Sequence, residues 1–257
     1  MDPRALDRQY ASSTNLAARI ELHRRCSTNP YGLQRWVFDC LELAPGVRVL
    51  EVGCGTGSLW RDNLDRLPAG VELVLTDRAP GMLAAAGAAV GERPARFVAC
   101  ALPDLPFSDG AFDLVVADHM LYHVEDRQRG LLAIRRVLRR GGALFATTNG
   151  AGHLGEIKDL LRELAIDAPN VSAAFTLENG EAQLRRVFPA VRRDVYADAL
   201  EVRDPELLLA YIASLGGGGA AAVAARRDAI LAAIASRMRG AVFHVGKSTG
   251  AFTVRAE

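Results

Sequence analysis

One glycine-rich stretch, residues 49–57 (V-L-E-V-G-C-G-T-G), constrains the fold of this 257-residue chain more than any other. The apolar residues at its start are typical of a strand that is covered on both faces of a sheet. Gly53, Gly55 and Gly57 follow at every second position, and glycine allows a tight turn and a close approach of ligand to backbone. Helical spacing over residues 58–66 then predicts a helix whose free N–H groups point at the turn.

The spacing of the glycines narrows the class of ligand. A dinucleotide-binding fingerprint reads G-x-G-x-x-G, whereas here the third glycine is Gly57 and Ser58 stands where that fingerprint needs glycine. No lysine follows the turn, which excludes a phosphate-gripping P-loop. Glu51 lies at the strand end, where a carboxylate would repel pyrophosphate but suit a cationic group such as an amino-acid ammonium. A tight turn without a ligand is the alternative interpretation.

The pattern E-x-G-x-G-x-G resembles the first motif of the class I S-adenosylmethionine-dependent methyltransferases, in particular the small-molecule, type 11 or UbiE-like group. Residues 102–107 (L-P-D-L-P-F) and 109–113 (D-G-A-F-D) resemble a later segment of that family, and the specific resemblance covers roughly residues 45–148. It implies a Rossmann-like, doubly wound α/β fold with a mostly parallel seven-stranded sheet, an antiparallel edge strand and helical lid insertions. It also implies S-adenosyl-L-methionine as cofactor and S-adenosyl-L-homocysteine as product.

A second carboxylate follows the glycine turn. Residues 71–77 are predicted to form a strand that ends at Asp77, where a carboxylate can accept hydrogen bonds from both hydroxyls of a ribose. A helix cap before Pro80 is the alternative interpretation. Folds that bind dinucleotides and folds that bind S-adenosylmethionine both use a carboxylate at this position to bind ribose, so Asp77 does not distinguish between them.

The resemblance extends the predicted cofactor site to neighbouring residues. Arg78 and Met82 are expected beside the adenosine, and Ala101 and Leu102 beside the adenine ring. The family often has an aspartate where this chain has Cys100, so adenine recognition is expected to depend more on backbone groups. The complete predicted cofactor-binding set is Tyr10, Glu51, Gly53, Cys54, Gly55, Gly57, Asp77, Arg78, Met82, Ala101, Leu102, Asp118 and His119.

Three residues are candidates for a catalytic base. His123 follows the predicted fourth strand (112–117), and ligands gather at the carboxyl ends of parallel strands. With Tyr122 it forms an aromatic–histidine pair similar to one in many small-molecule methyltransferases. His153 and Glu156, three residues apart at a predicted helix start, could pair, and the carboxylate would then raise the basicity of the imidazole. A structural or surface role is the alternative for each histidine.

The chain is expected to contain four segments. They are an N-terminal helical cap (1–45), a cofactor-binding Rossmann-like core (46–148), a lid or acceptor insertion (149–190), and the C-terminal part of the sheet with a helical insertion (191–257). Tyr10 of the cap either contacts the cofactor or only packs. Residues 191–202 are predicted to form one strand, and the runs 242–245 and 251–254 flank a turn signal, G-K-S-T-G.

Amino-acid composition limits the kinds of binding partner that this chain is expected to have. The 31 basic and 30 acidic residues give a formal net charge of +1, so no strong electrostatic attraction to nucleic acid or to an anionic membrane is expected. The four cysteines form no C-x-x-C pair and are typical of reduced thiols, so neither a metal site nor a disulfide framework is predicted. Without a signal peptide or a membrane-spanning run, we expect a cytoplasmic monomer or homodimer that acts on a small-molecule acceptor.

These patterns favour an enzyme that transfers a methyl group from S-adenosylmethionine to an oxygen, nitrogen or carbon atom of a small organic acceptor, such as a secondary metabolite. A nicotinamide-dependent oxidoreductase is an alternative that the glycine turn and Asp77 permit, although Glu51 and Ser58 count against it. A regulatory protein that binds the cofactor without turnover is another, because an intact glycine motif predicts binding but not catalysis. No motif identifies the acceptor.

Overall fold

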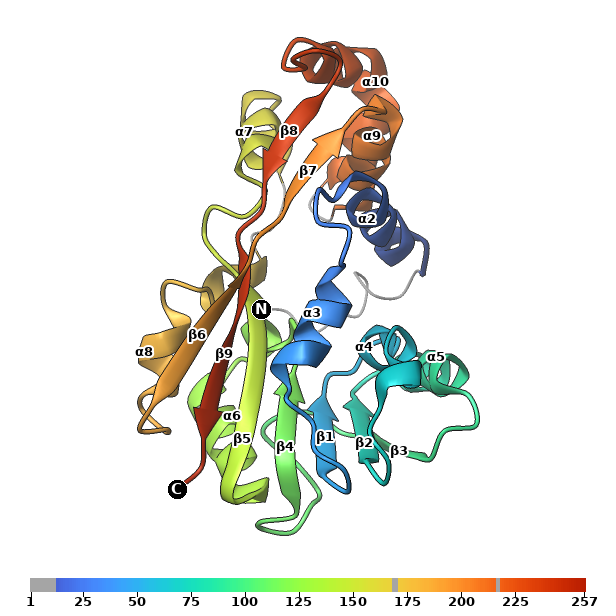
Figure 1. Ribbon diagram of the computed structural model, residues 1–257. Helices are drawn as coiled ribbons and strands as arrows, with labels where there is room; N and C mark the ends of the chain where they lie inside the picture. Colours follow the sequence, from blue (N-terminus) through green and yellow to red (C-terminus); the bar gives the residue numbers. More distant parts are fainter. Residues whose placement is uncertain (1–12, 168–170, 216–217) are drawn as a thin grey trace. The chain divides into compact units, whose positions relative to one another are not determined.

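The computed structural model describes residues 13–167, 171–215 and 218–257 (Figure 1). The chain divides into two compact units. The larger consists of residues 31–151, 172–196 and 249–257, and the smaller of the described parts of 1–30, 152–171 and 197–248. The predicted insertion, 149–190, is therefore shared between the two units.

A seven-stranded sheet forms the larger unit, in the order β3-β2-β1-β4-β5-β9-β6 (Figure 1). Its strands are β1 (Arg48–Val52), β2 (Glu72–Asp77), β3 (Ala95–Ala99), β4 (Phe112–Ala117), β5 (Leu138–Asn149), β6 (Val191–Tyr196) and β9 (Thr249–Arg255). Strands β1 to β5 pair in parallel, whereas β9 runs antiparallel to both β5 and β6. The predicted Rossmann-like α/β fold is confirmed, with the antiparallel strand lying one position inside the edge strand β6.

Helices cover both faces of this sheet because alternate residues of each buried strand point to opposite sides. Leu50 and Val52 pack in a cluster with α6 (Arg127–Val137) and α8 (Gly180–Leu184), whereas Val49 packs in another with α3 (Leu33–Cys40), α4 (Ser58–Arg61) and α5 (Pro80–Val90). Two short 3₁₀ segments of this unit are η1 (Leu64–Arg66) and η2 (Leu121–His123), and η3 (Val171–Ala174) begins in the smaller unit. The doubly wound arrangement thus follows from apolar residues on both faces.

Two predicted helices of the larger unit have different boundaries. The predicted helix over 58–66 is split into α4 and η1 at Asn63, whose backbone is not helical and whose buried amide donates to the carbonyl of Leu59 (2.8 Å). Helical spacing over residues 128–140 also predicts a helix, but α6 ends at Val137, because Leu138 is already extended and pairs with Phe112 of β4.

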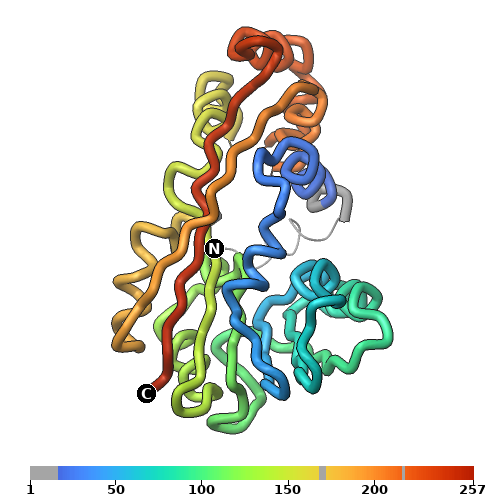
Figure 2. Tube along the Cα trace, in the orientation of Figure 1, coloured from blue at the N-terminus to red at the C-terminus, as the bar shows by residue number. Residues whose placement is uncertain are grey.

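The described part of the smaller unit combines four helices with a two-stranded antiparallel sheet. Its elements are α2 (Ser13–Cys26), α7 (Gly155–Glu163), β7 (Ala199–Val202), α9 (Pro205–Ser214), α10 (Gly219–Ala235) and β8 (Phe243–Gly246). Figure 2 traces β7 and β8 side by side, in agreement with their register. Buried residues from all three chain segments, such as Leu22, Ile157 and Leu208, form one core cluster. Among the described residues, no helix has the length and apolar character needed to cross a membrane.

The predicted strand over 191–202 is wrong as a single strand, because β6 belongs to the large sheet and β7 to the small one. The break comes at Asp198, whose buried carboxylate accepts hydrogen bonds from the backbone N–H groups of Asn29 and Ala199 and pairs with the buried Lys247 ammonium. The runs 242–245 and 251–254 do not form a hairpin either, since β8 pairs with β7, and β9 with β5 and β6.

Candidate functional site

The turn after β1 has the backbone that its glycines predict. Gly53, Gly55 and Gly57 have φ angles of +69°, +52° and +70°, in the left-handed region that favours glycine. A Cβ at Gly53 would lie 3.0 Å from the Cβ of Met120, and one at Gly57 would lie 3.1 Å from the Cα of Ala86 in α5. A Cβ at Gly55 would meet no atom within 4 Å. Packing therefore leaves little room for a side chain at Gly53 and Gly57, while Gly55 faces open space.

Asp77, at the carboxyl end of β2, holds this turn in place. One carboxylate oxygen accepts a hydrogen bond from the N–H of Gly55 (3.0 Å) and the other from the N–H of Ala79 (2.9 Å), just before α5. The carbonyl of Thr76 accepts another from the N–H of Cys54 (2.8 Å). Asp77 thus braces both the turn and the entry to α5. Each carboxylate oxygen has further lone pairs, so ribose binding stays a compatible prediction.

Glu51 lies in β1, just before the turn, with only 2% of its surface exposed. The indole N–H of Trp60 donates to its Oε2 (2.6 Å). The pKa of the Glu51 carboxyl is raised to about 8, mainly by burial and also by the charges of Asp118 and Asp77, while the Trp60 hydrogen bond opposes the shift. A cation beside this carboxyl would favour its ionised form, which fits the predicted ammonium partner.

Asp118 and His119 follow β4 and are tied to neighbouring elements. Asp118 accepts hydrogen bonds from the hydroxyl of Thr147 in β5 and from Nε2 of Gln34 in α3 (3.3 Å). The backbone N–H of His119 donates to the Thr147 hydroxyl (2.8 Å), and His119 has a positive φ of 50°. Gln34 was absent from the predicted site. Its contact with Asp118 joins residues 84 positions apart, so no local sequence pattern indicates it.

His123 lies in η2 within the same unit as the glycine turn. Its ring meets the ring of Tyr122 edge-on, with centroids 4.5 Å apart. The pKa of His123 is lowered to about 4, mainly by burial and also by the charges of Arg78 and His119. An imidazole with this pKa is neutral at physiological pH and a weak base, which fits hydrogen bonding or packing better than proton abstraction.

His153 and Glu156 lie in the smaller unit, unlike the described members of the predicted cofactor set. Nδ1 of His153 is 3.1 Å from the carbonyl oxygen of Ser248, and its ring stacks on that of His23 with centroids 6.2 Å apart. The Glu156 carboxylate accepts a hydrogen bond from the N–H of Gly246 (2.8 Å). Both side chains therefore contact the segment at the end of β8, and their mutual pairing stays a prediction.

The other predicted cofactor residues lie around the same strand ends. Arg78 and Ala101 are exposed, and Met82 and Leu102 are half-buried, all within the larger unit. Leu102 packs against the core beneath α6. Tyr10 lies outside the described residues.

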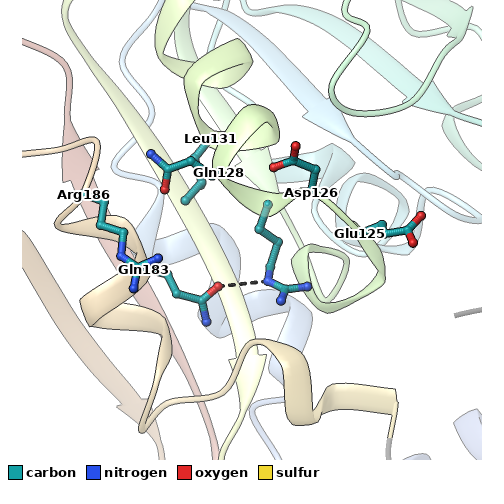
Figure 3. A pocket seen from close by; sticks show the side chains of 7 residues that line it. Glu125, Asp126, Gln128, Leu131, Gln183 and Arg186 are labelled. Carbon is teal, nitrogen blue, oxygen red and sulfur yellow. Dashed lines mark hydrogen bonds between the residues drawn. The ribbon is translucent and has the colours of Figure 1, made fainter.

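A cavity of about 310 Å³ lies elsewhere in the larger unit, between the start of α6 and α8 (Figure 3). Its lining residues are Glu125, Asp126, Arg127, Gln128, Leu131, Gln183 and Arg186. Nε of Arg127 donates to the side-chain oxygen of Gln183 across it (2.9 Å), as the dashed line in Figure 3 marks. None of these residues belongs to the predicted cofactor set, so this cavity is separate from the glycine turn.

Comparison with known proteins shows what the segment around the glycine turn is similar to. A family model described as a methyltransferase domain matches residues 50–146. The ubiquinone/menaquinone biosynthesis C-methyltransferase UbiE of Idiomarina loihiensis is 32% identical over 116 residues, which cover 44% of this chain and 46% of that protein. The malonyl-[acyl-carrier protein] O-methyltransferase of Pseudescherichia vulneris is 34% identical over 132 residues, 49% of each chain. The chain spans about half the length of these curated relatives.

A solved structure supports the same fold. Phosphoethanolamine N-methyltransferase 2 of Haemonchus contortus, in complex with S-adenosyl-L-methionine, aligns with a TM-score of 0.60 and 19% identity, covering 97% of this chain and 58% of that one. The segment that matches the family model contains the glycine turn, Asp77 and Asp118. This match, together with the E-x-G-x-G-x-G turn, supports a domain similar to the class I S-adenosylmethionine-dependent methyltransferases over residues 50–146.

Proposed function

We propose that this chain binds S-adenosyl-L-methionine at the glycine turn and transfers its methyl group to a small organic acceptor. The observation that carries the proposal is the open space over Gly55, flanked by two carboxylates at the ends of adjacent strands. Asp77 offers acceptors for ribose hydroxyls, and the buried Glu51 suits a neighbouring cation. A nucleoside that carries an amino-acid ammonium matches both demands, because the cation favours the ionised form of Glu51, whereas a pyrophosphate offers no positive charge.

The chemistry of the cofactor leaves the protein mainly with binding and alignment. S-adenosylmethionine supplies an electrophilic methyl carbon on a sulfonium, which an acceptor attacks in line. The residues around the turn would fix the donor, and the remaining groups would orient the acceptor and exclude water. A proton must also be removed when the acceptor is a phenol or a carbon acid. His153 and Glu156 are our candidates for that step, with the weakly basic His123 ranked below them.

The acceptor is proposed at the level of a small organic molecule. The names of the relatives describe methylation at carbon in one case and at oxygen in the other, and the aligned structure is an N-methyltransferase. The same cofactor-binding fold therefore serves all three acceptor atoms, and the choice depends on residues outside the matched segment. We propose a cytoplasmic enzyme whose acceptor is not nucleic acid, in line with its balanced charge.

The experiment that tests this proposal compares two cofactor classes by calorimetry and thermal unfolding. S-adenosyl-L-homocysteine is expected to bind in the micromolar range and to raise the Tm, because a ligand that binds only the folded state stabilises it by mass action. NAD and NADP serve as the comparison. A Tm shift with a nicotinamide and none with saturating S-adenosyl-L-homocysteine would overturn the proposal. Transfer of a labelled methyl group to a panel of phenols, quinols, amines and acyl thioesters then tests turnover.

A further inference from the structure

Gln34 carries a buried polar atom that its surroundings leave unsatisfied. Its side-chain oxygen, Oε1, is shielded from solvent and has no hydrogen-bond partner among the described residues. Leaving a buried carbonyl oxygen without a donor is destabilising, because the oxygen loses its hydrogen bonds to water and gains none in return. Such an atom in a packed element calls for an explanation, and a bound group that donates to it is one.

The orientation of the Gln34 amide follows from its neighbour. Nε2 lies 3.3 Å from Oδ2 of Asp118, and an ionised carboxylate can only accept hydrogen bonds. The nitrogen must therefore face Asp118, so Oε1 points elsewhere. The position of α3 is also fixed, because the Asn63 amide donates both to the backbone carbonyl of Gln34 (3.1 Å) and to that of Leu59 in α4 (2.8 Å).

The unsatisfied oxygen lies in a region that is rich in acceptors. Asp118 follows β4, which pairs directly with β1, the strand that carries Glu51 and leads into the glycine turn. The charge of Asp118 reaches Glu51, since it helps to raise the pKa of that carboxyl. Gln34, Asp118 and Glu51 thus present oxygen acceptors near the carboxyl ends of adjacent strands, where ligands of this kind of sheet collect. An ammonium group, with three donors and a positive charge, complements them.

We propose that Gln34 is a cofactor-binding residue whose side-chain oxygen accepts a hydrogen bond from the ammonium group of the methyl donor, while Asp118 and Glu51 supply the negative charge. This inference rests on the proposed function, because it requires the amino-acid end of the cofactor to lie at this strand edge. It assigns the ammonium a neutral acceptor on α3, which precedes the segment that matches the family model.

The test compares ligands with and without the ammonium. The affinity of wild-type protein and of Gln34→Leu is measured by calorimetry for S-adenosyl-L-homocysteine and for its deaminated analogue, S-(5′-adenosyl)-4-thiobutyrate. Gln34→Leu is expected to weaken binding of S-adenosyl-L-homocysteine about tenfold and to change binding of the analogue less than about twofold. Gln128→Leu, at an exposed glutamine of α6, is the matched control and should change neither affinity.

A second comparison separates direct contact from bracing of Asp118. In an Asp118→Asn background, Gln34→Leu should still weaken S-adenosyl-L-homocysteine binding severalfold if Gln34 contacts the ammonium itself. Equal losses for both ligands, no loss at all, or a loss that vanishes in that background would overturn the inference. Failure of wild-type protein to bind S-adenosyl-L-homocysteine would instead overturn the proposed function. Gln34→Met, which keeps the length of the side chain, replaces the leucine variant if that variant unfolds.

Discussion

Replacing Glu51 by glutamine is expected to stabilise the ligand-free protein, and increasingly so as the pH rises. Glutamine has nearly the same volume, and its side-chain oxygen can still accept the hydrogen bond from Trp60. Wild-type protein must bury a carboxyl group that can ionise, at a site with 2% exposure, whereas the variant buries a neutral amide. The effect should therefore appear as a pH-dependent difference between the two proteins rather than as a constant one.

The sign follows from the raised pKa. The pKa of Glu51 is about 4.5 in the unfolded chain but about 8 in the folded one. Between these values the unfolded state binds fewer protons, so the free energy of unfolding falls as the pH rises and levels off above about 8. At about 1.4 kcal/mol per pKa unit, the difference between the two pKa values lowers the free energy of unfolding by on the order of 5 kcal/mol in total. Between about pH 5.5 and about pH 8.5 the change is about 3 kcal/mol.

Urea unfolding followed by circular dichroism measures this difference without depending on the fluorescence of Trp60. The free energy of unfolding of Glu51→Gln minus that of wild type should grow by about 3 kcal/mol over that pH range. Glu72→Gln is the control, because Glu72 is an exposed carboxylate at the start of the neighbouring strand β2. Parallel pH profiles for wild type and Glu51→Gln would refute the assignment of an uncharged Glu51 at neutral pH.

The cofactor residues and His153 yield further predictions. Asp77→Ala should keep a cooperative unfolding transition but weaken S-adenosyl-L-homocysteine binding, measured by calorimetry, by on the order of 1–3 kcal/mol. An unchanged affinity would mean that Asp77 only braces the turn. Gly55→Val should weaken binding more, because a β-branched residue disfavours the φ of +52° and its side chain enters the open space over this position. Wild-type affinity for this variant would contradict a ligand over residue 55. His153→Ala should leave that affinity within about twofold but slow labelled-methyl transfer to an accepted phenol or quinol, and an unchanged rate would remove His153 from the transfer step.

The features that the sequence predicted well are those encoded over a few neighbouring residues. A positive φ is a local requirement, and Gly53 and Gly57 have it where the pattern indicates. Asp77 is found at a strand end because the apolar run before it has the length of a buried strand. The same local patterns predicted the strands that the structure shows as β1, β2 and β4.

The predictions failed where distant residues decide the structure. Alternation over 191–202 indicates a strand but not which partner each half pairs with, and the buried charge of Asp198 is satisfied by groups at 27–29 and 247. Gln34 illustrates the same limit in the site itself. An amide on an amphipathic helix has no local pattern that shows which carboxylate it will face 84 positions later.

Cofactor affinity and methyl transfer are expected to respond to different parts of the chain. Every described member of the predicted cofactor set lies in the larger unit, whereas His153 and Glu156 lie in the smaller one, which has a core of its own. Both side chains also contribute to that unit, through Ser248 and Gly246. A substitution there that merely loosens the fold should lower the Tm and the transfer rate together. A rate loss at unchanged Tm and unchanged product affinity is therefore the result that only a role in transfer explains.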